Sequence, residues 1–127
     1  MKKELEQYFG CEVKIAEYKN KLPLPIFMTM RDIVMVEIYG VTFAIIDVMK
    51  ETELSVAAMK KQKAKYEEAL QCPVAYEVAI NNVSMRNALV KSGVPFVNLP
   101  GNVFLPFMGI VLQDVYRKQL VKADKMM

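Results

Sequence analysis

The chain has 127 residues, of which 54% are hydrophobic, and its formal net charge is only +3. This length suits a single domain with one core, and so mild a charge does not by itself indicate a nucleic-acid-binding protein. No apolar run reaches the roughly 20 residues of a membrane span, and the charged first residues lack the apolar region of a signal peptide. We therefore predict a cytoplasmic protein with no membrane segment.

Histidine is absent from the sequence, and the two cysteines, Cys11 and Cys72, form no metal-binding spacing. The absence of histidine excludes Ser-His-Asp triads and histidine-ligated metal sites. The glycine-rich motifs that bind dinucleotides or nucleotide phosphates are missing as well. We predict no cofactor, and any catalysis would have to use carboxylates and lysines.

The beginning of the chain predicts one short helix and two strands. Lys2–Phe9 has the pattern of a helix, and Gly10 follows it, where a left-handed cap is favoured. Residues 12–18 alternate between apolar and polar side chains, as a half-exposed strand does. Residues 26–30 are a further candidate strand after an extended segment that contains two prolines.

Residues 32–48, DIVMVEIYGVTFAIIDV, contain two apolar runs that meet at Tyr39-Gly40. Both runs are rich in valine, isoleucine or phenylalanine, which favour strands. We predict two adjacent strands at the middle of a sheet, with the second strand buried on both faces. The rest of the chain would then cover this central hairpin.

After the hairpin, the pattern alternates between helix and strand. Ser55 can cap a helix that runs to about Leu70, residues 73–80 form the next apolar run, and Asn82 can cap a shorter helix. The inner face of the first helix is predicted to hold Met59, Tyr66, Ala69 and Leu70. A strand, helix, strand series of this length implies a parallel, right-handed crossover.

The last part of the chain predicts a short hairpin and a final helix. Residues 94–98 and 103–105 are short strands around Pro100-Gly101, which suits a type II turn. From Leu112 the pattern turns helical again. We predict an α/β or α+β domain over residues 1–112, with a mixed sheet and helical crossovers, and a linker helix over residues 113–127.

The segment VPFVNLPGNVFLPFMGIVLQD, residues 94–114, resembles the end of the amino-terminal domain of bacterial MarR-type winged-helix transcriptional regulators. The residues that carry the resemblance are Pro95-Phe96, Pro100-Gly101, Leu105-Pro106 and Gly109-Ile110. Leu54-Ser55, Pro73-Val74 and Arg86 also fall where that group places similar residues. The resemblance extends over roughly residues 43–113 and concerns structural residues rather than a catalytic motif.

The resemblance implies that DNA is bound by a winged helix downstream of this domain. The domain itself would then form a homodimer, position the winged helix, or sense a small-molecule effector. It implies no enzymatic activity.

A nuclease is the main alternative. The predicted order of elements is also that of the PD-(D/E)xK restriction-endonuclease-like core, in which carboxylates bind Mg²⁺ and a lysine assists the attacking water. Glu37, Asp47 and Lys50 are the candidate trio. Asp47 and Lys50 are three residues apart, which puts them on opposite faces of a strand unless a bulge intervenes. The core would therefore be either an active nuclease or a degenerate relative.

Basic residues on the two predicted helices form a candidate nucleic-acid contact. Lys60, Lys61 and Lys63, together with Arg86, can hold phosphates electrostatically, and Lys65 lies beside them. The alternative is an ordinary solvated helix face, balanced by the glutamates that follow.

Methionine suggests a third function. The chain has 10 methionines, and several lie near the predicted core strands. Methionine can line an adaptable ligand pocket, although it also fills gaps in ordinary cores. A small-molecule sensor is therefore a further hypothesis.

Overall fold

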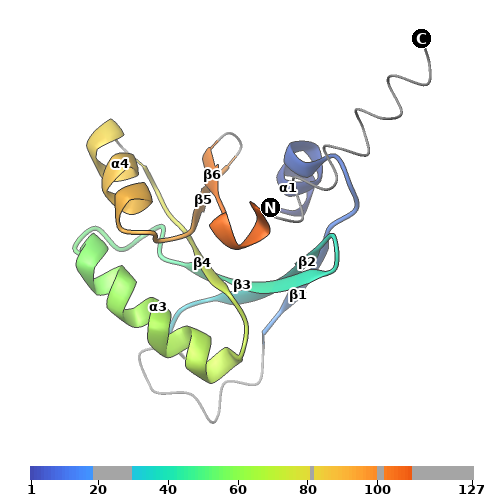
Figure 1. Ribbon diagram of the computed structural model, residues 1–127, viewed down its shortest axis with the longest axis horizontal. Coiled ribbons are helices and arrows are strands. Elements are labelled where there is room, and N and C mark those ends of the chain that lie inside the picture. The colour runs from blue at the N-terminus through green and yellow to red at the C-terminus, as the bar shows by residue number, and fades with distance from the viewer. Residues whose placement is uncertain (19–29, 81, 100–101, 110–127) are drawn as a thin grey trace.

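The computed structural model describes residues 1–18, 30–80, 82–99 and 102–109. These residues form an open, six-stranded mixed sheet with helices on both faces (Figure 1). The elements in chain order are α1 (Lys2–Phe9), β1 (Lys14–Glu17), β2 (Ile33–Ile38), β3 (Val41–Asp47), α3 (Val56–Leu70), β4 (Val74–Glu77), α4 (Val83–Lys91), β5 (Phe96–Asn98), β6 (Asn102–Phe104) and the 3₁₀ turn η1 (Pro106–Met108). The predicted α/β class with a mixed sheet is confirmed.

The central hairpin forms as predicted. β2 and β3 pair antiparallel, and the turn residues Tyr39 and Gly40 have φ angles of 52° and 80°. Positive φ at both central residues is characteristic of a type I′ turn, whose twist matches that of the two strands. Four consecutive residues of β3, from Phe43 to Ile46, are buried, so this strand is covered on both faces.

The two predicted crossovers are also present. β3 pairs parallel with β4 through α3, and β4 pairs parallel with β5 through α4. The Ser55 hydroxyl accepts a hydrogen bond from the Ala58 N–H at 3.1 Å, and the Asn82 side chain accepts one from the Met85 N–H at 2.8 Å. Both predicted N-caps therefore fix where their helices begin.

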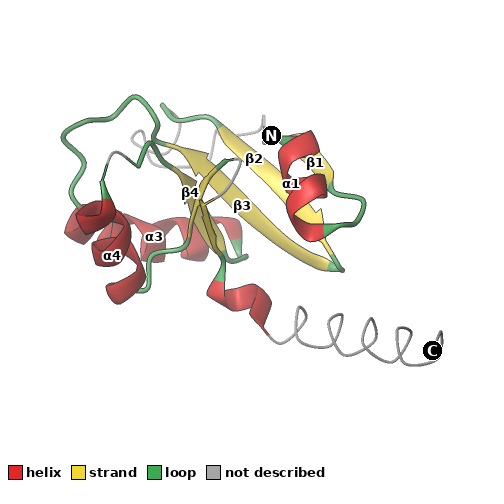
Figure 2. Ribbon diagram, turned by 90° about the horizontal axis from the view of Figure 1, so that it is seen from above, coloured by secondary structure: helices red, strands yellow, loops and turns green. Residues whose placement is uncertain are grey.

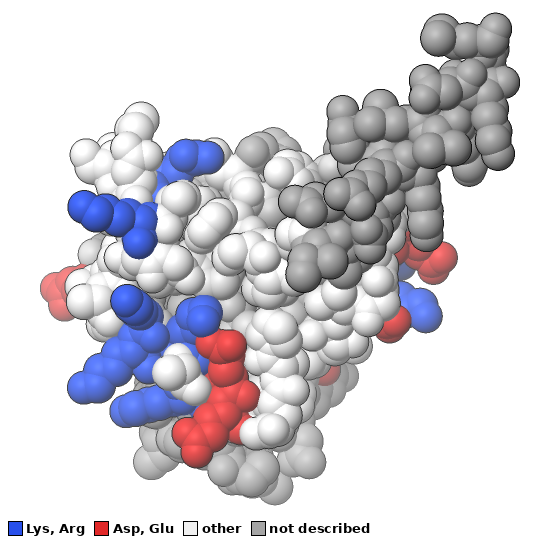
Figure 3. Space-filling model, viewed as in Figure 1, with Lys and Arg blue, Asp and Glu red and all other residues white. Residues whose placement is uncertain are grey.

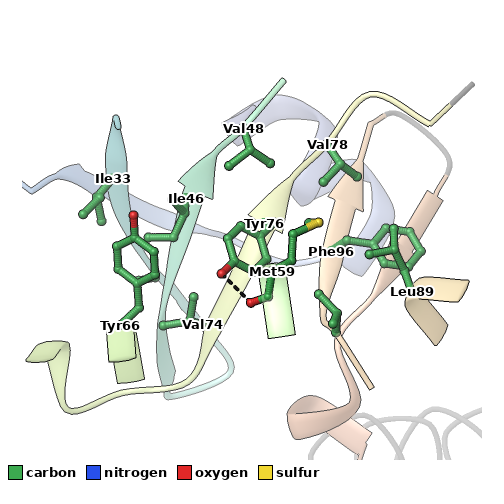
Figure 4. Packing of buried hydrophobic residues seen from close by; sticks show 12 residues of the cluster. Ile33, Ile46, Val48, Met59, Tyr66, Val74, Tyr76, Val78, Leu89 and Phe96 are labelled. Carbon is green, nitrogen blue, oxygen red and sulfur yellow. Dashed lines mark hydrogen bonds between the residues drawn. The ribbon is translucent and has the colours of Figure 1, made fainter. Parts of the chain in front are cut away.

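α3 and α4 cover one face of the sheet and lie beside each other (Figure 1, Figure 2). The aromatic rings of Tyr66 and Tyr76 meet edge to face in this layer, and the Tyr76 hydroxyl donates to the Met59 carbonyl at 2.9 Å (Figure 4). The buried cluster consists of Ile33, Ala44, Ile46, Val48, Met59, Tyr66, Val74, Tyr76, Val78, Leu89, Val94 and Phe96.

α1 and η1 cover the opposite face of the sheet. Leu5 and Phe9 of α1 and Met108 of η1 pack there with the side chains that β2, β3 and β4 direct away from α3. The left-handed cap at Gly10 ends α1 as predicted, with φ of 69°. The fold therefore has two buried layers on either side of one sheet.

Some details differ from the sequence prediction. Ala69 is exposed, because about 100° of rotation per residue places it about 80° around the helix axis from Met59. β4 ends at Glu77 rather than at residue 80. The strand predicted over residues 26–30 lies almost wholly outside the described residues, as do the Pro-Gly turn and the helix over residues 113–127. No helix within the described ranges combines the length and apolar character needed to span a membrane.

Candidate functional site

A pocket of about 450 Å³ lies at the carboxyl ends of β3 and β4, where α3 and α4 begin. We call it the α3–α4 pocket. Its lining residues are Val48, Met49, Glu51, Thr52, Leu54, Ser55, Val56, Met59, Val78, Ala79, Ser84 and Met85. In open α/β sheets, ligands bind beyond the carboxyl ends of the strands, so the position is typical of a binding site.

The sheet supplies the floor of this pocket. Val48 and Val78 directly follow β3 and β4 and are buried. The Val48 N–H donates to the Glu77 carbonyl, and the Val78 N–H donates to the Val97 carbonyl, each at 3.0 Å. These hydrogen bonds continue the parallel register one residue beyond the strands, which keeps the floor in place.

The lining is mainly apolar, with a few hydroxyl groups and the carboxylate of Glu51, which is paired with Arg31. Met59 comes from α3 and Met85 from α4, and the unbranched methionine side chain adapts to ligands of different shape. Thr52 and Ser84 add hydroxyls, whereas the Ser55 hydroxyl already caps α3. The volume lies within the range of about 300 to 1,000 Å³ that is usual for small-molecule sites. The arrangement suits a small, largely apolar molecule with one or two polar atoms.

A second pocket, of about 510 Å³, lies at the same end of β3 but is lined mostly by charged residues. Its lining includes Arg31, whose guanidinium donates to both carboxylate oxygens of Glu51 at 2.6 and 2.8 Å. The same guanidinium donates to the Gln62 side chain and to the Tyr66 hydroxyl. Arg31 therefore ties the segment before β2 to α3, and its charge is already matched by Glu51.

The structure does not bring the three nuclease candidates together. Glu37 pairs with Thr42 near the hairpin turn, whereas Asp47 lies five residues further along β3, about 17 Å at roughly 3.3 Å per residue. Asp47 and Lys50 both line the charged pocket. Within the described part of the chain, no three acidic or cysteine side chains are grouped so that they could hold a metal ion.

The predicted basic residues lie on one side of the sheet. Lys60 and Lys61 on α3 and Arg86 on α4 are exposed. Lys63 is only half-exposed, and its ammonium group forms an ion pair with Glu67 at 2.6 Å. The sequence interpretation grouped Lys63 with Lys60 and Lys61. In the structure, Lys63 differs from them because it is paired with Glu67.

Comparison with known proteins gave no relative. No protein-family model matches the chain, and neither a curated protein nor a solved structure is similar to it at the level of significance required. The resemblance to MarR-type regulators therefore stays a prediction.

Glu77 was missed by the sequence interpretation. It pairs with Asp47 in the β3–β4 register, so two carboxylates lie on neighbouring strands and on the same face. Burial, and then the negative charge of Asp47, raise the pKa of Glu77 above its ordinary value. Only the strand register reveals this pair, because the two residues are 30 positions apart.

We expect Glu77→Gln to stabilise the fold at pH 7 but much less at pH 4. Because the pKa of Glu77 is raised in the folded state, stability is lost as the pH rises from the unfolded pKa of about 4.3 through the folded pKa. Glutamine carries no charge and removes this loss. Urea unfolding at pH 7 and at pH 4 measures the free energy of unfolding of this variant and of the wild type. The exposed Glu12→Gln is the control. If Glu77→Gln changes the free energy of unfolding equally at the two pH values, the pKa of Glu77 is not raised in the folded protein.

Proposed function

We propose that this chain is a non-enzymatic regulatory domain whose input is a small, largely apolar molecule bound in the α3–α4 pocket. The observation that carries the proposal is the pocket itself. It lies beyond the carboxyl ends of two parallel strands, has a volume of about 450 Å³, and combines apolar walls with a few hydroxyls. Methionines from two different helices line it, which suits an adaptable site.

The output of the domain is proposed from the sequence resemblance. In a MarR-type regulator, DNA would be bound by a downstream winged helix, and this domain would pass the state of the pocket to it. Homodimer formation belongs to the same prediction. The separation of Glu37 from Asp47 favours this regulatory role over a nuclease.

A ligand in the α3–α4 pocket would act by holding the two helices in one arrangement. It would contact α3 through Met59 and α4 through Met85, while Val48 and Val78 keep the floor fixed. Such a ligand stabilises the conformation to which it binds more tightly. The shift in population toward that conformation grows with the difference between the ligand's affinities for the two conformations. The cations on the outer sides of α3 and α4 would follow any shift of these helices.

The test is a thermal-unfolding screen of the chain against small aromatic and medium-chain aliphatic compounds such as indole, octanol and octanoate. A compound at 100 times its Kd should stabilise the wild type by about 2.7 kcal/mol. Ser84→Phe places a ring at the pocket rim and should abolish this stabilisation. Asn87→Phe is the matched control, because Asn87 is also exposed on α4 but does not line the pocket.

Two outcomes would contradict the proposal. One is that none of the compounds raises the unfolding temperature of the wild type. The other is that Ser84→Phe responds to the active compound as strongly as Asn87→Phe does, because binding would then lie elsewhere on the molecule.

A further inference from the structure

The two helices on one face of the sheet carry a run of positive charge that no acidic residue interrupts. The segment from Val56 to Lys65 contains four lysines, and α4 contains Arg86 and Lys91, with no aspartate or glutamate in either. Acidic residues appear in α3 only at Glu67 and Glu68, near its carboxyl end. The charge is therefore concentrated over most of α3 and all of α4.

Five of these six cations are exposed, and of the five, Lys65 has a partner of its own; the other four are Lys60 and Lys61 on α3, and Arg86 and Lys91 on α4. We call them the basic face. None of the four has an ion-pair partner among the residues whose structure is described. Figure 3 shows the blue side chains in two groups on the side of the molecule that α3 and α4 form, with red side chains beside the lower group and a smaller red patch at the left edge between the two groups.

The two helices that carry the basic face both pack against the sheet. α3 is fixed to the sheet by the buried residues Met59 and Tyr66, and α4 by Leu89. Both helix backbones that carry the cations are therefore packed on the same face of the sheet, which places the cations on one side of the domain. Cations spread over two helices on one side of the domain fit the regularly spaced phosphates of an extended duplex better than the few charges of a short acidic peptide.

We infer that the basic face binds the phosphate backbone of double-stranded DNA. Duplex DNA presents one negative charge per roughly 1.7 Å of its axis, and lysine and arginine are its usual phosphate contacts. A lipid surface fits less well, because membrane-binding helices insert aromatic residues or leucine, whereas the exposed apolar residues of α4 are Val83 and Val90. The contact is independent of base sequence, since it involves phosphates only.

This inference goes beyond the proposed function, because it places a DNA contact in the α/β domain itself and does not depend on the α3–α4 pocket. Four phosphate contacts give a slope of about −3.6 for the logarithm of affinity against the logarithm of salt concentration. Affinity should therefore fall roughly a hundredfold when salt rises from about 50 to 200 mM. A weak, steeply salt-dependent interaction is expected for this chain alone.

The experiment measures binding of the full chain to a labelled DNA duplex of mixed sequence by fluorescence anisotropy at several salt concentrations. Lys60→Glu/Arg86→Glu should weaken binding at least about tenfold and reduce the salt slope by about two. Lys2→Glu/Lys3→Glu is the matched control, because it changes the net charge equally at exposed residues of α1 on the other face. The control should keep the wild-type slope.

Three results would overturn the inference. The first is that the wild type fails to bind the duplex at about 50 mM salt. The second is that the two double variants lose affinity equally, because equal losses would indicate only an effect of net charge. The third is that phosphatidylserine vesicles or polyglutamate bind the wild type as tightly as the duplex at the same salt concentration. Circular dichroism of both variants establishes that they are folded.

Discussion

Replacing Leu89 with alanine is expected to lower the free energy of unfolding by about 2 to 5 kcal/mol, the largest single-residue effect that we predict. Leu89 is the one fully buried residue among the nine of α4, with an exposed fraction of 0%. Its loss leaves a cavity between α4 and the sheet, and Met85, the other residue of α4 that packs against the buried cluster, is only partly buried. Urea unfolding monitored by circular dichroism measures the change.

Val90→Ala is the matched control for this experiment. Val90 is the next residue of α4 and is 38% exposed, so its truncation should cost less than about 1 kcal/mol. Because α4 forms one wall of the α3–α4 pocket, Leu89→Ala should also weaken the binding of any compound that stabilises the wild type. Similar unfolding free energies for the two variants would show that α4 is not held to the sheet by Leu89.

The second large effect is expected for Tyr76→Phe, which should lower the free energy of unfolding by about 1 to 2 kcal/mol. The Tyr76 side chain is fully buried, and its hydroxyl donates to the Met59 carbonyl at 2.9 Å. Burial raises the pKa of Tyr76 above its ordinary value, so the hydroxyl keeps the proton that it donates. Removing that hydroxyl leaves a buried carbonyl without this partner.

Tyr8→Phe provides the control for Tyr76→Phe, because the same oxygen is removed from a side chain that is 49% exposed. Its expected effect on unfolding is within about 0.5 kcal/mol of zero. The hydrogen bond from Tyr76 links β4 to α3 behind the α3–α4 pocket. If both variants unfold like the wild type, that bond does not stabilise the helix on the sheet.

The elements that the sequence predicted correctly depend on local signals. Ser55 and Asn82 cap helices because their side chains reach N–H groups only three residues away. The turn at Tyr39-Gly40 and the burial of β3 follow from residue type and from the length of the apolar run. The two helical crossovers, through α3 and α4, then indicated that the strands they connect are parallel.

The site could not be predicted in the same way, because it depends on distant residues. The α3–α4 pocket combines the ends of two strands with the beginnings of two helices, so Met59 and Met85 meet there only after folding. The pairing of Asp47 with Glu77 depends on strand register. Register also explains why Glu37 and Asp47, which lie on adjacent strands, are far apart.

The most direct test of the central claim is the methionine methyl NMR spectrum of the full chain, recorded without and with the compound that stabilises it most. The methyl signals of Met49, Met59 and Met85, which line the α3–α4 pocket, are expected to shift on saturation. Met108, buried on the opposite face of the sheet, and Met35 on β2 should stay in place. Shifts confined to Met108 or Met35, or unchanged signals from the three pocket methionines, would contradict ligand binding in the α3–α4 pocket.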